Sequence, residues 1–200
     1  MKKGRLWSVL LMLALLLTLA PALGGSAKAA AGTKVCIVTD TGYATLVELN
    51  QTVTLSNGGT ALFRPNWSGK CLLVLENYVV NGSGVYTLDG SEYGIYCDGD
   101  LEIQIQGTCS ISSTGGGTAN NRYGIYASGS LTIQDSERGD NKLTVNMGKT
   151  ASVSAAGIYC GGTLKIWEGQ FGGTVIVNAT GSGVTGGTSY GVYARDGVDA

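Results

Sequence analysis

The chain contains no histidine and almost no proline, and both absences narrow what it can be. Without histidine it has no Cys₂His₂ zinc site and no His-based catalytic triad, and it lacks the histidine of a C-x-x-C-H haem-attachment motif. Pro65 is the one proline after residue 29, and charged residues make up only 14% of the chain. Glycine is abundant instead, at 33 of 200 residues, more than double the usual share of about 7%. High glycine with Val, Ile, Thr and Tyr between is typical of short strands joined by tight turns.

Residues 1–29 have the pattern of a cleavable signal peptide. A basic start precedes an almost wholly apolar stretch over 6–20, which is too short to span a membrane comfortably. The sequence Ala27-Lys28-Ala29 fits the small-x-small rule and predicts cleavage after Ala29. A retained membrane anchor is the alternative, but no stop-transfer pattern follows. We therefore expect a secreted or cell-surface protein with no membrane segment after cleavage.

Cleavage leaves nine basic and 14 acidic residues, a net charge of −5. This balance disfavours nucleic acid and anionic membranes as partners, because both require a basic face. The cysteines are odd in number and none forms a C-x-x-C pair, which argues against a complete disulfide framework. They are Cys36, Cys71, Cys97, Cys109 and Cys160.

One short motif occurs four times in the second half of the chain. The copies are Tyr93-Gly94-Ile95-Tyr96, Tyr123-Gly124-Ile125-Tyr126, Ala156-Gly157-Ile158-Tyr159 and Tyr190-Gly191-Val192-Tyr193. Their glycines stand 30, 33 and 34 residues apart. In three copies a second block follows: Gly99-Asp100-Leu101-Glu102-Ile103, Gly129-Ser130-Leu131-Thr132-Ile133 and Gly162-Thr163-Leu164-Lys165-Ile166. A period of this length indicates a solenoid, a propeller or an array.

Strand alternation predicts which residues of the repeat are buried. It places Ile95, Ile125, Ile158 and Val192 on one face, with Cys97, Ala127, Cys160 and Ala194 two residues on; these side chains are apolar or small, so we assign that face to the interior. Leu101, Leu131 and Leu164 repeat the pattern on a second strand, with Glu102, Thr132 and Lys165 outward. A third, less regular strand covers 109–111, 143–145 and 175–177.

Three short strands in roughly 31 residues make one triangular coil of a right-handed parallel β-helix, an all-β solenoid, over 93–200. We expect Gly99, Gly129 and Gly162 to turn the chain with positive φ, and 113–121 and 179–188 to form longer corner loops. A β-propeller blade needs four antiparallel strands and about 40 residues, and an antiparallel sandwich needs no fixed motif spacing.

Residues 30–92 lack the motif, although 35–38, 53–55 and 71–75 have strand patterns. We expect one or two irregular coils that cap the core. The fourth copy ends as its second strand begins, so we expect further domains beyond residue 200; the alternative is a last coil covered by a partner.

The outward tyrosines Tyr96, Tyr126, Tyr159 and Tyr193 are the candidate ligand-binding residues. Stacked along one side of the coil, they would form a platform for a polysaccharide. The alternative is that they only stabilise neighbouring strands, by about 0.2–1 kcal/mol per pair. Trp167, on the outward side of its strand, and Trp67, in a polar stretch, are further candidates for stacking on a sugar.

Acidic residues offer the only hint of a metal. Asp98 and Asp100 share one turn, and Asp135, Glu137 and Asp140 another, and calcium binds clustered oxygens. However, no calcium-loop motif is present, and Ser128, Gly161 and Arg195 replace Asp98 in the other copies. We interpret both groups as solvated turns and expect no cofactor, with calcium at Asp98 and Asp100 as the alternative.

Cys97 and Cys160 are equivalent positions two coils apart, hence separated by about 9.6 Å. A disulfide needs a Cα separation of roughly 4.4–6.8 Å, so we interpret them as small buried side chains. A disulfide among Cys36, Cys71 and Cys109 stays open.

The pattern Tyr-Gly-Ile-Tyr-x-x-Gly-x-Leu-x-Ile after an export signal resembles bacterial cell-surface β-helix repeat proteins. These are often described as carbohydrate-binding-domain-containing and share the pectate-lyase-like fold. The resemblance covers about 93–200 and implies extracellular polysaccharide binding or adhesion. Enzymatic members of the wider fold use clustered calcium-binding aspartates beside a basic residue, and no such cluster repeats here.

Three functions follow. The first is an exported, non-catalytic β-helix that binds polysaccharide or cell-wall glycan, or mediates adhesion. The second is a passive stalk or spacer in a larger surface protein. The third is a polysaccharide lyase or hydrolase, which needs paired carboxylates or a metal.

Overall fold

The computed structural model describes residues 34–65, 70–82, 85–113, 119, 121–136, 139–147, 154–167, 174–181 and 188–199. The predicted signal peptide, Trp67, Glu137 and most of both predicted corner loops lie outside these residues. Within them the chain is all-β, with 18 strands and no helix. The same part of the chain accordingly offers no helix of the length and apolar character that crossing a membrane requires.

Each sequence repeat forms three strands, and the fourth forms two. The strands are β8 (Ser91–Cys97), β9 (Leu101–Gln106) and β10 (Thr108–Ser113); β11 (Asn121–Ala127), β12 (Leu131–Asp135) and β13 (Asp140–Met147); β14 (Ser154–Cys160), β15 (Leu164–Trp167) and β16 (Thr174–Gly181); and β17 (Ser189–Ala194) and β18 (Val198–Asp199).

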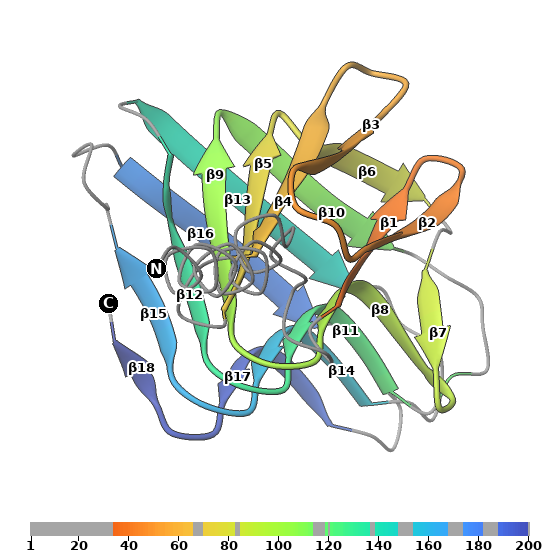
Figure 1. Cartoon of the computed structure of the whole chain (residues 1–200). Helices are drawn as coiled ribbons and strands as arrows, with labels where there is room; N and C mark the ends of the chain where they lie inside the picture. The colour runs from red at the N-terminus through yellow and green to blue at the C-terminus, as the bar shows by residue number, and fades with distance from the viewer. Residues whose placement is uncertain are drawn as a thin grey trace, which may run out of the picture.

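Equivalent strands of successive repeats lie side by side in three sheets (Figure 1). Sheet A contains β8, β11, β14 and β17, sheet B contains β9, β12, β15 and β18, and sheet C contains β10, β13 and β16. The pairing between repeats is parallel throughout, and Ile95, Ile125 and Ile158 occupy equivalent positions in it. The parallel, in-register pairing predicted from the motif is therefore confirmed for these strands.

Residues before the repeats form seven further strands. They are β1 (Val35–Thr39), β2 (Gly42–Leu46), β3 (Gln51–Thr54), β4 (Thr60–Pro65), β5 (Cys71–Glu76), β6 (Val79–Gly82) and β7 (Tyr86–Leu88). β5 and β6 pair in parallel with β9 and β10, so they extend the repeat pattern. β1 and β7 pair antiparallel with β8, and β4 pairs antiparallel with β5. Antiparallel strands thus occupy the first edges of sheets A and B.

The hydrophobic core runs between the three sheets. Ile95, Ile103 and Ile111 come from β8, β9 and β10, and each is fully buried. The next repeat supplies Ile125, Ile133 and Val145 in the same way, so each repeat buries its apolar face against its neighbours.

The glycine of the motif interrupts strict strand alternation. A Cβ on Gly94 would lie 2.5 Å from the Gly124 carbonyl oxygen and 2.7 Å from Ile111 Cγ2, so Gly94 faces the core together with Ile95. Tyr93 consequently shares the outer face with Tyr96, and their ring centroids are 4.9 Å apart. The motif needs glycine because the backbone of the next repeat fills the space of a side chain.

Two turn glycines are required for a reason different from the one predicted. Gly99 has the expected positive φ of 146°. Gly129 and Gly162 do not, and a Cβ on Gly162 would instead lie 2.5 Å from Ser130 Oγ and 3.0 Å from its backbone nitrogen. Close stacking of successive turns, rather than a left-handed conformation, excludes larger residues there.

Three other predictions are corrected. Val192 is 38% exposed rather than interior, because β17 is the last strand of its sheet and has a strand neighbour on one edge only among the described residues. Leu143 pairs with Val177, whereas the predicted alignment of 143–145 with 175–177 set it against Val175. Asp135 does not belong to a solvated turn, because it ends β12 and is 1% exposed.

Candidate functional site

The four candidate tyrosines stack in one column on the outer face of sheet A. Their side chains project from β8, β11, β14 and β17, which the parallel register brings into line. Neighbouring ring centroids lie 5.5 Å, 5.0 Å and 5.0 Å apart, with interplanar angles of 5°, 3° and 8°. These distances follow the strand spacing of about 4.8 Å.

Stacking limits what this column can offer a ligand. Tyr126 lies between Tyr96 and Tyr159, so both faces of its ring are covered by other rings. Tyr159 is covered in the same way by Tyr126 and Tyr193. A sugar that stacks on an aromatic residue needs a free ring face, so these two residues present mainly ring edges to a ligand.

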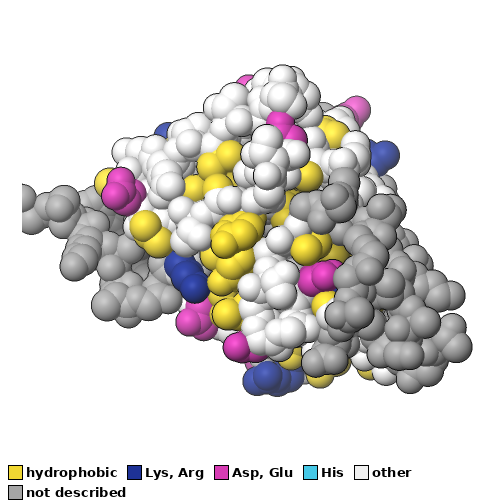
Figure 2. Space-filling view, turned by 90° about the vertical axis from the view of Figure 1, so that its right-hand side faces the viewer, with side chains coloured by type: hydrophobic (Ala, Val, Ile, Leu, Met, Phe, Trp, Pro, Cys, Tyr) yellow, Lys and Arg dark blue, Asp and Glu magenta, His cyan; other side chains and the backbone are white. Residues whose placement is uncertain are grey.

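A second group of tyrosines widens the column, and the sequence analysis did not predict it. Tyr93 and Tyr123 stack at 5.4 Å, and each also contacts Tyr126. Tyr86 of β7 packs on Tyr96 at 5.7 Å and on Tyr43 of β2 at 5.2 Å. On the side of the molecule where β1, β2 and β7 lie, hydrophobic side chains gather at the middle of the surface, with charged groups around them (Figure 2). Strict alternation does not allow for the inward-facing Gly94, so it missed Tyr93 and Tyr123; Tyr86 and Tyr43 were missed because they lie on strands outside the repeats.

Packing disfavours the ionised form of three of these phenols, those of Tyr96, Tyr123 and Tyr126. Desolvation raises the pKa of Tyr96 and of Tyr123 to about 12; neighbouring phenols add to the effect at both residues, and Asp98 adds to it at Tyr96. Burial also raises the pKa of Tyr126, and the neighbouring Tyr159 adds to it. Tyr96, Tyr123 and Tyr126 therefore keep their phenol protons to a higher pH than an exposed tyrosine does.

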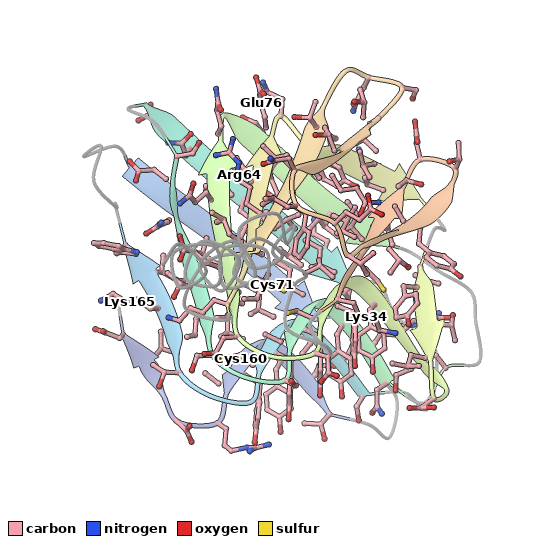
Figure 3. All side chains as sticks on the ribbon, in the orientation of Figure 1. Lys34, Arg64, Cys71, Glu76, Cys160 and Lys165 are labelled. Atoms are coloured by element: carbon pink, nitrogen blue, oxygen red, sulfur yellow. The ribbon has the colours of Figure 1, made fainter. Side chains whose placement is uncertain are left out.

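Trp167 lies on a different surface, the outer face of sheet B. Its side chain is 42% exposed, and the parallel register places it beside Gln134 of β12, itself beside Gln104 of β9. Lys165, which is labelled in Figure 3, lies on the same strand, and its Nζ is 5.1 Å from the centre of the Trp167 ring. The two candidate surfaces are thus separate: the tyrosines belong to sheet A and the tryptophan to sheet B.

Polar side chains accompany Trp167 along sheet B. Glu102 Oε1 accepts hydrogen bonds from Gln104 Nε2 at 3.0 Å and from Gln134 Nε2 at 2.7 Å. Lys165 forms an exposed ion pair of 3.8 Å with Asp199. The result is a row of amide and carboxylate groups beside the partly exposed indole of Trp167.

The acidic candidates for calcium contribute to turns between repeats. Asp100 Oδ1 accepts the backbone N–H of Ser130 at 2.8 Å, and Asp98 Oδ1 accepts the Ser128 hydroxyl at 3.4 Å. Within the described ranges, no three side chains of the His, Cys, Asp or Glu type come together in a way that could hold a metal ion.

A buried ion pair is the main charged feature that the sequence did not indicate. Arg122 Nη2 lies 2.7 Å from Glu92 Oε2, and the Arg122 side chain is fully buried. Arg122 of β11 lies opposite Glu92 of β8 in the parallel register. On its other side Arg122 lies opposite Ala155 of β14. A glutamate and an arginine thirty residues apart give no signal until the repeat register is known.

All five cysteines are buried and free. Ala127 lies between Cys97 and Cys160 in the register, which agrees with the prediction that they are small core residues too far apart to bond. The structure forms no disulfide among Cys36, Cys71 and Cys109.

Comparison with known proteins adds no relative, since no family model, no curated protein and no solved structure matches the chain.

Proposed function

We propose that this chain is a right-handed parallel β-helix, exported by the signal over residues 1–29, which acts without catalysis by binding polysaccharide or by mediating adhesion at a cell surface. The parallel, in-register strands support the solenoid architecture. The basic, apolar and small-residue segments at the start of the chain support export.

The observation that carries the proposal is the exposed indole of Trp167 beside a row of polar side chains. Pyranose rings present C–H groups that stack on an aromatic face, and hydroxyls that bond to amides and carboxylates. Trp167, partly exposed and with Lys165 Nζ over its ring, supplies the aromatic surface, while Gln134 and Glu102 supply hydrogen-bonding groups on adjacent strands. Because strands repeat at about 4.8 Å, this surface suits an extended polymer lying across them better than a single sugar.

The tyrosine column has a different part in this proposal. With the ring faces of Tyr126 and Tyr159 covered, its first role is to join successive repeats, each pair contributing about 0.2–1 kcal/mol. Its edges and phenol groups provide a second, weaker contact surface. Contacts of this kind are weak one by one, and a polymer that engages several of them gains affinity by multivalency.

Binding to an array of polysaccharides tests the proposal. Trp167→Ala should reduce binding of the wild-type ligand at least tenfold, while the paired change Tyr126→Ala and Tyr159→Ala should reduce it less at equal folded fraction. Leu49→Ala is the matched control, because Leu49 is an apolar residue that is 53% exposed and lies outside both surfaces. Wild-type protein that binds no polysaccharide on the array contradicts the proposal.

A passive stalk is the second candidate, and the covered tyrosine faces favour it. Such a module needs only rigidity between its ends, which stacked rings and a continuous core provide. It predicts an elongated particle in small-angle scattering together with no glycan binding by any variant.

A further inference from the structure

Two buried cysteines that are far apart in sequence meet at the corner between sheets A and B. Cys97 ends β8 and Cys71 begins β5, and both are fully buried. The Cys71 side chain lies close enough to raise the pKa of the Cys97 thiol, and burial adds to the effect. Figure 3 labels Cys71 near the middle of the fold.

The backbone brings the two residues together independently of that contact. The carbonyl oxygen of Asp100 accepts the backbone N–H of Cys71 at 3.0 Å, and the Cys97 thiol lies 3.8 Å from the same oxygen. Cys71 also pairs with Leu101, which follows Cys97 by four residues around the corner. The Asp100 carbonyl group therefore lies beside both cysteines, which places them at the same corner of the fold.

The repeat itself supplies a comparison. Leu101, Leu131 and Leu164 occupy the position of Cys71 in the later repeats, and Cys160 occupies that of Cys97. The Cys160 thiol lies 3.4 Å from the Gly162 carbonyl oxygen and near the backbone of Leu131. Cys160 thus has a leucine where Cys97 has a second thiol.

We propose that Cys71 and Cys97 form a disulfide when the chain folds in the presence of an oxidising disulfide. The bond ties the first repeat to β5, the strand that precedes it in sheet B. It involves Cys97, which sequence reasoning treated only as a small core residue, and leaves Cys36, Cys109 and Cys160 as thiols.

The oxidant is a disulfide, either of a small molecule or of a thiol–disulfide oxidoreductase. The thiolate of one cysteine attacks it, which forms a mixed disulfide and releases one thiol. The second cysteine, deprotonated, then attacks the mixed disulfide, forms the Cys71–Cys97 bond and releases the second thiol. The two thiol protons end on the released thiolates, so the external disulfide gains the two electrons that the protein loses.

Because both cysteines are buried in the folded chain, the disulfide has to form during folding. Both residues have no exposed surface in the folded chain, so an external disulfide reaches them only before the corner closes. Oxidation should therefore accompany refolding, while folded, reduced protein should react slowly with the same reagent.

Proteolysis after glutamate shows which cysteines are joined, because it places each cysteine in a separate peptide. Cleavage after Glu48, Glu76, Glu92, Glu102, Glu137 and Glu168 separates all five. The full chain without its signal is refolded with oxidised and reduced glutathione, alkylated in denaturant, and analysed by mass spectrometry. We expect three alkylated cysteines and one disulfide-linked pair of peptides, in which residues 49–76 are joined to residues 93–102. The oxidised protein should also unfold at a higher urea midpoint than the reduced protein.

Cys160 and Leu131 provide the matched test of geometry. In the variant Leu131→Cys the introduced thiol should bond to Cys160 under the same conditions, while Leu164→Cys, whose position faces Ala194, should add only a free thiol. Cys109→Ser should leave the Cys71–Cys97 link intact. Folded wild-type protein with five alkylated cysteines, or with any other pair joined, overturns the proposal.

Discussion

Replacing Gly124 with alanine tests the close stacking of repeats at a single atom. The added Cβ would lie 2.5 Å from the Gly157 carbonyl oxygen, and it would also meet Val145 Cγ1 and Met147 Cγ. The carbonyl oxygen belongs to the paired backbone of β14 and cannot rotate away as a side chain can. Overpacking a close-packed core typically costs 1–3 kcal/mol, so we expect the free energy of unfolding to fall by about 3 kcal/mol.

Urea unfolding followed by circular dichroism measures this change. With a slope of about 2 kcal/mol per molar urea, the midpoint should fall by roughly 1.5 M. Gly58→Ala is the control, since it removes the same backbone freedom but places its Cβ in open space. Its φ of +86° should cost about 1 kcal/mol of strain. If Gly124→Ala costs no more than Gly58→Ala, the strands of sheet A are not packed as described.

Two other predictions concern buried and shielded groups. Arg122→Ala leaves the Glu92 carboxylate buried without its cation and should lower the free energy of unfolding by about 3–5 kcal/mol, whereas Arg122→Met with Glu92→Leu should recover most of it; equal losses in the two variants, measured by urea unfolding, would contradict this account of the ion pair. Stability should also fall as pH rises between about 10 and 12, because Tyr96 and Tyr123 keep their protons to a pKa of about 12 in the folded state while an unfolded tyrosine loses its proton near pH 10. Urea midpoints across this range, with tyrosinate absorbance in the near ultraviolet, measure the loss, and a midpoint unchanged up to pH 12 would refute it.

The sequence was sufficient for the features that repeat. Ile95, Ile125 and Ile158 were placed in one interior column, and Leu101, Leu131 and Leu164 in another, because a fixed motif spacing and strand alternation define both. The stacking of Tyr96 on Tyr126 follows from the same register. These elements are local patterns copied along the chain, so one correct repeat predicts the others.

Features that depend on deviations from the pattern were missed. The inward turn of Gly94 puts Tyr93 outside, and no alternation rule indicates it. The antiparallel pairing of β1 with β8 joins residues about sixty positions apart that share no motif. Leu143 was aligned with the wrong residue of β16, because the segment before it varies in length between repeats. The contact of Cys71 with Cys97 needs the register between β5 and β9, which lies outside the recognisable repeats.

Similarly, the candidate site could be located only in part. Strand alternation predicted that the side chains of Tyr126 and Trp167 point outward. Whether a ring face is free depends on side-chain packing across strands, which covers Tyr126 and leaves Trp167 exposed. The sequence therefore indicated the aromatic residues but not which of them has an open surface.

The arrangement of equivalent residues opposite one another is tested most directly by nuclear magnetic resonance of protein labelled at isoleucine. Backbone Overhauser contacts should join the neighbourhood of Ile95 to that of Ile125, and Ile125 to Ile158, in parallel order. Contacts that join Ile125 to neither residue, or that run in antiparallel order, would contradict the stacking from which both candidate surfaces follow.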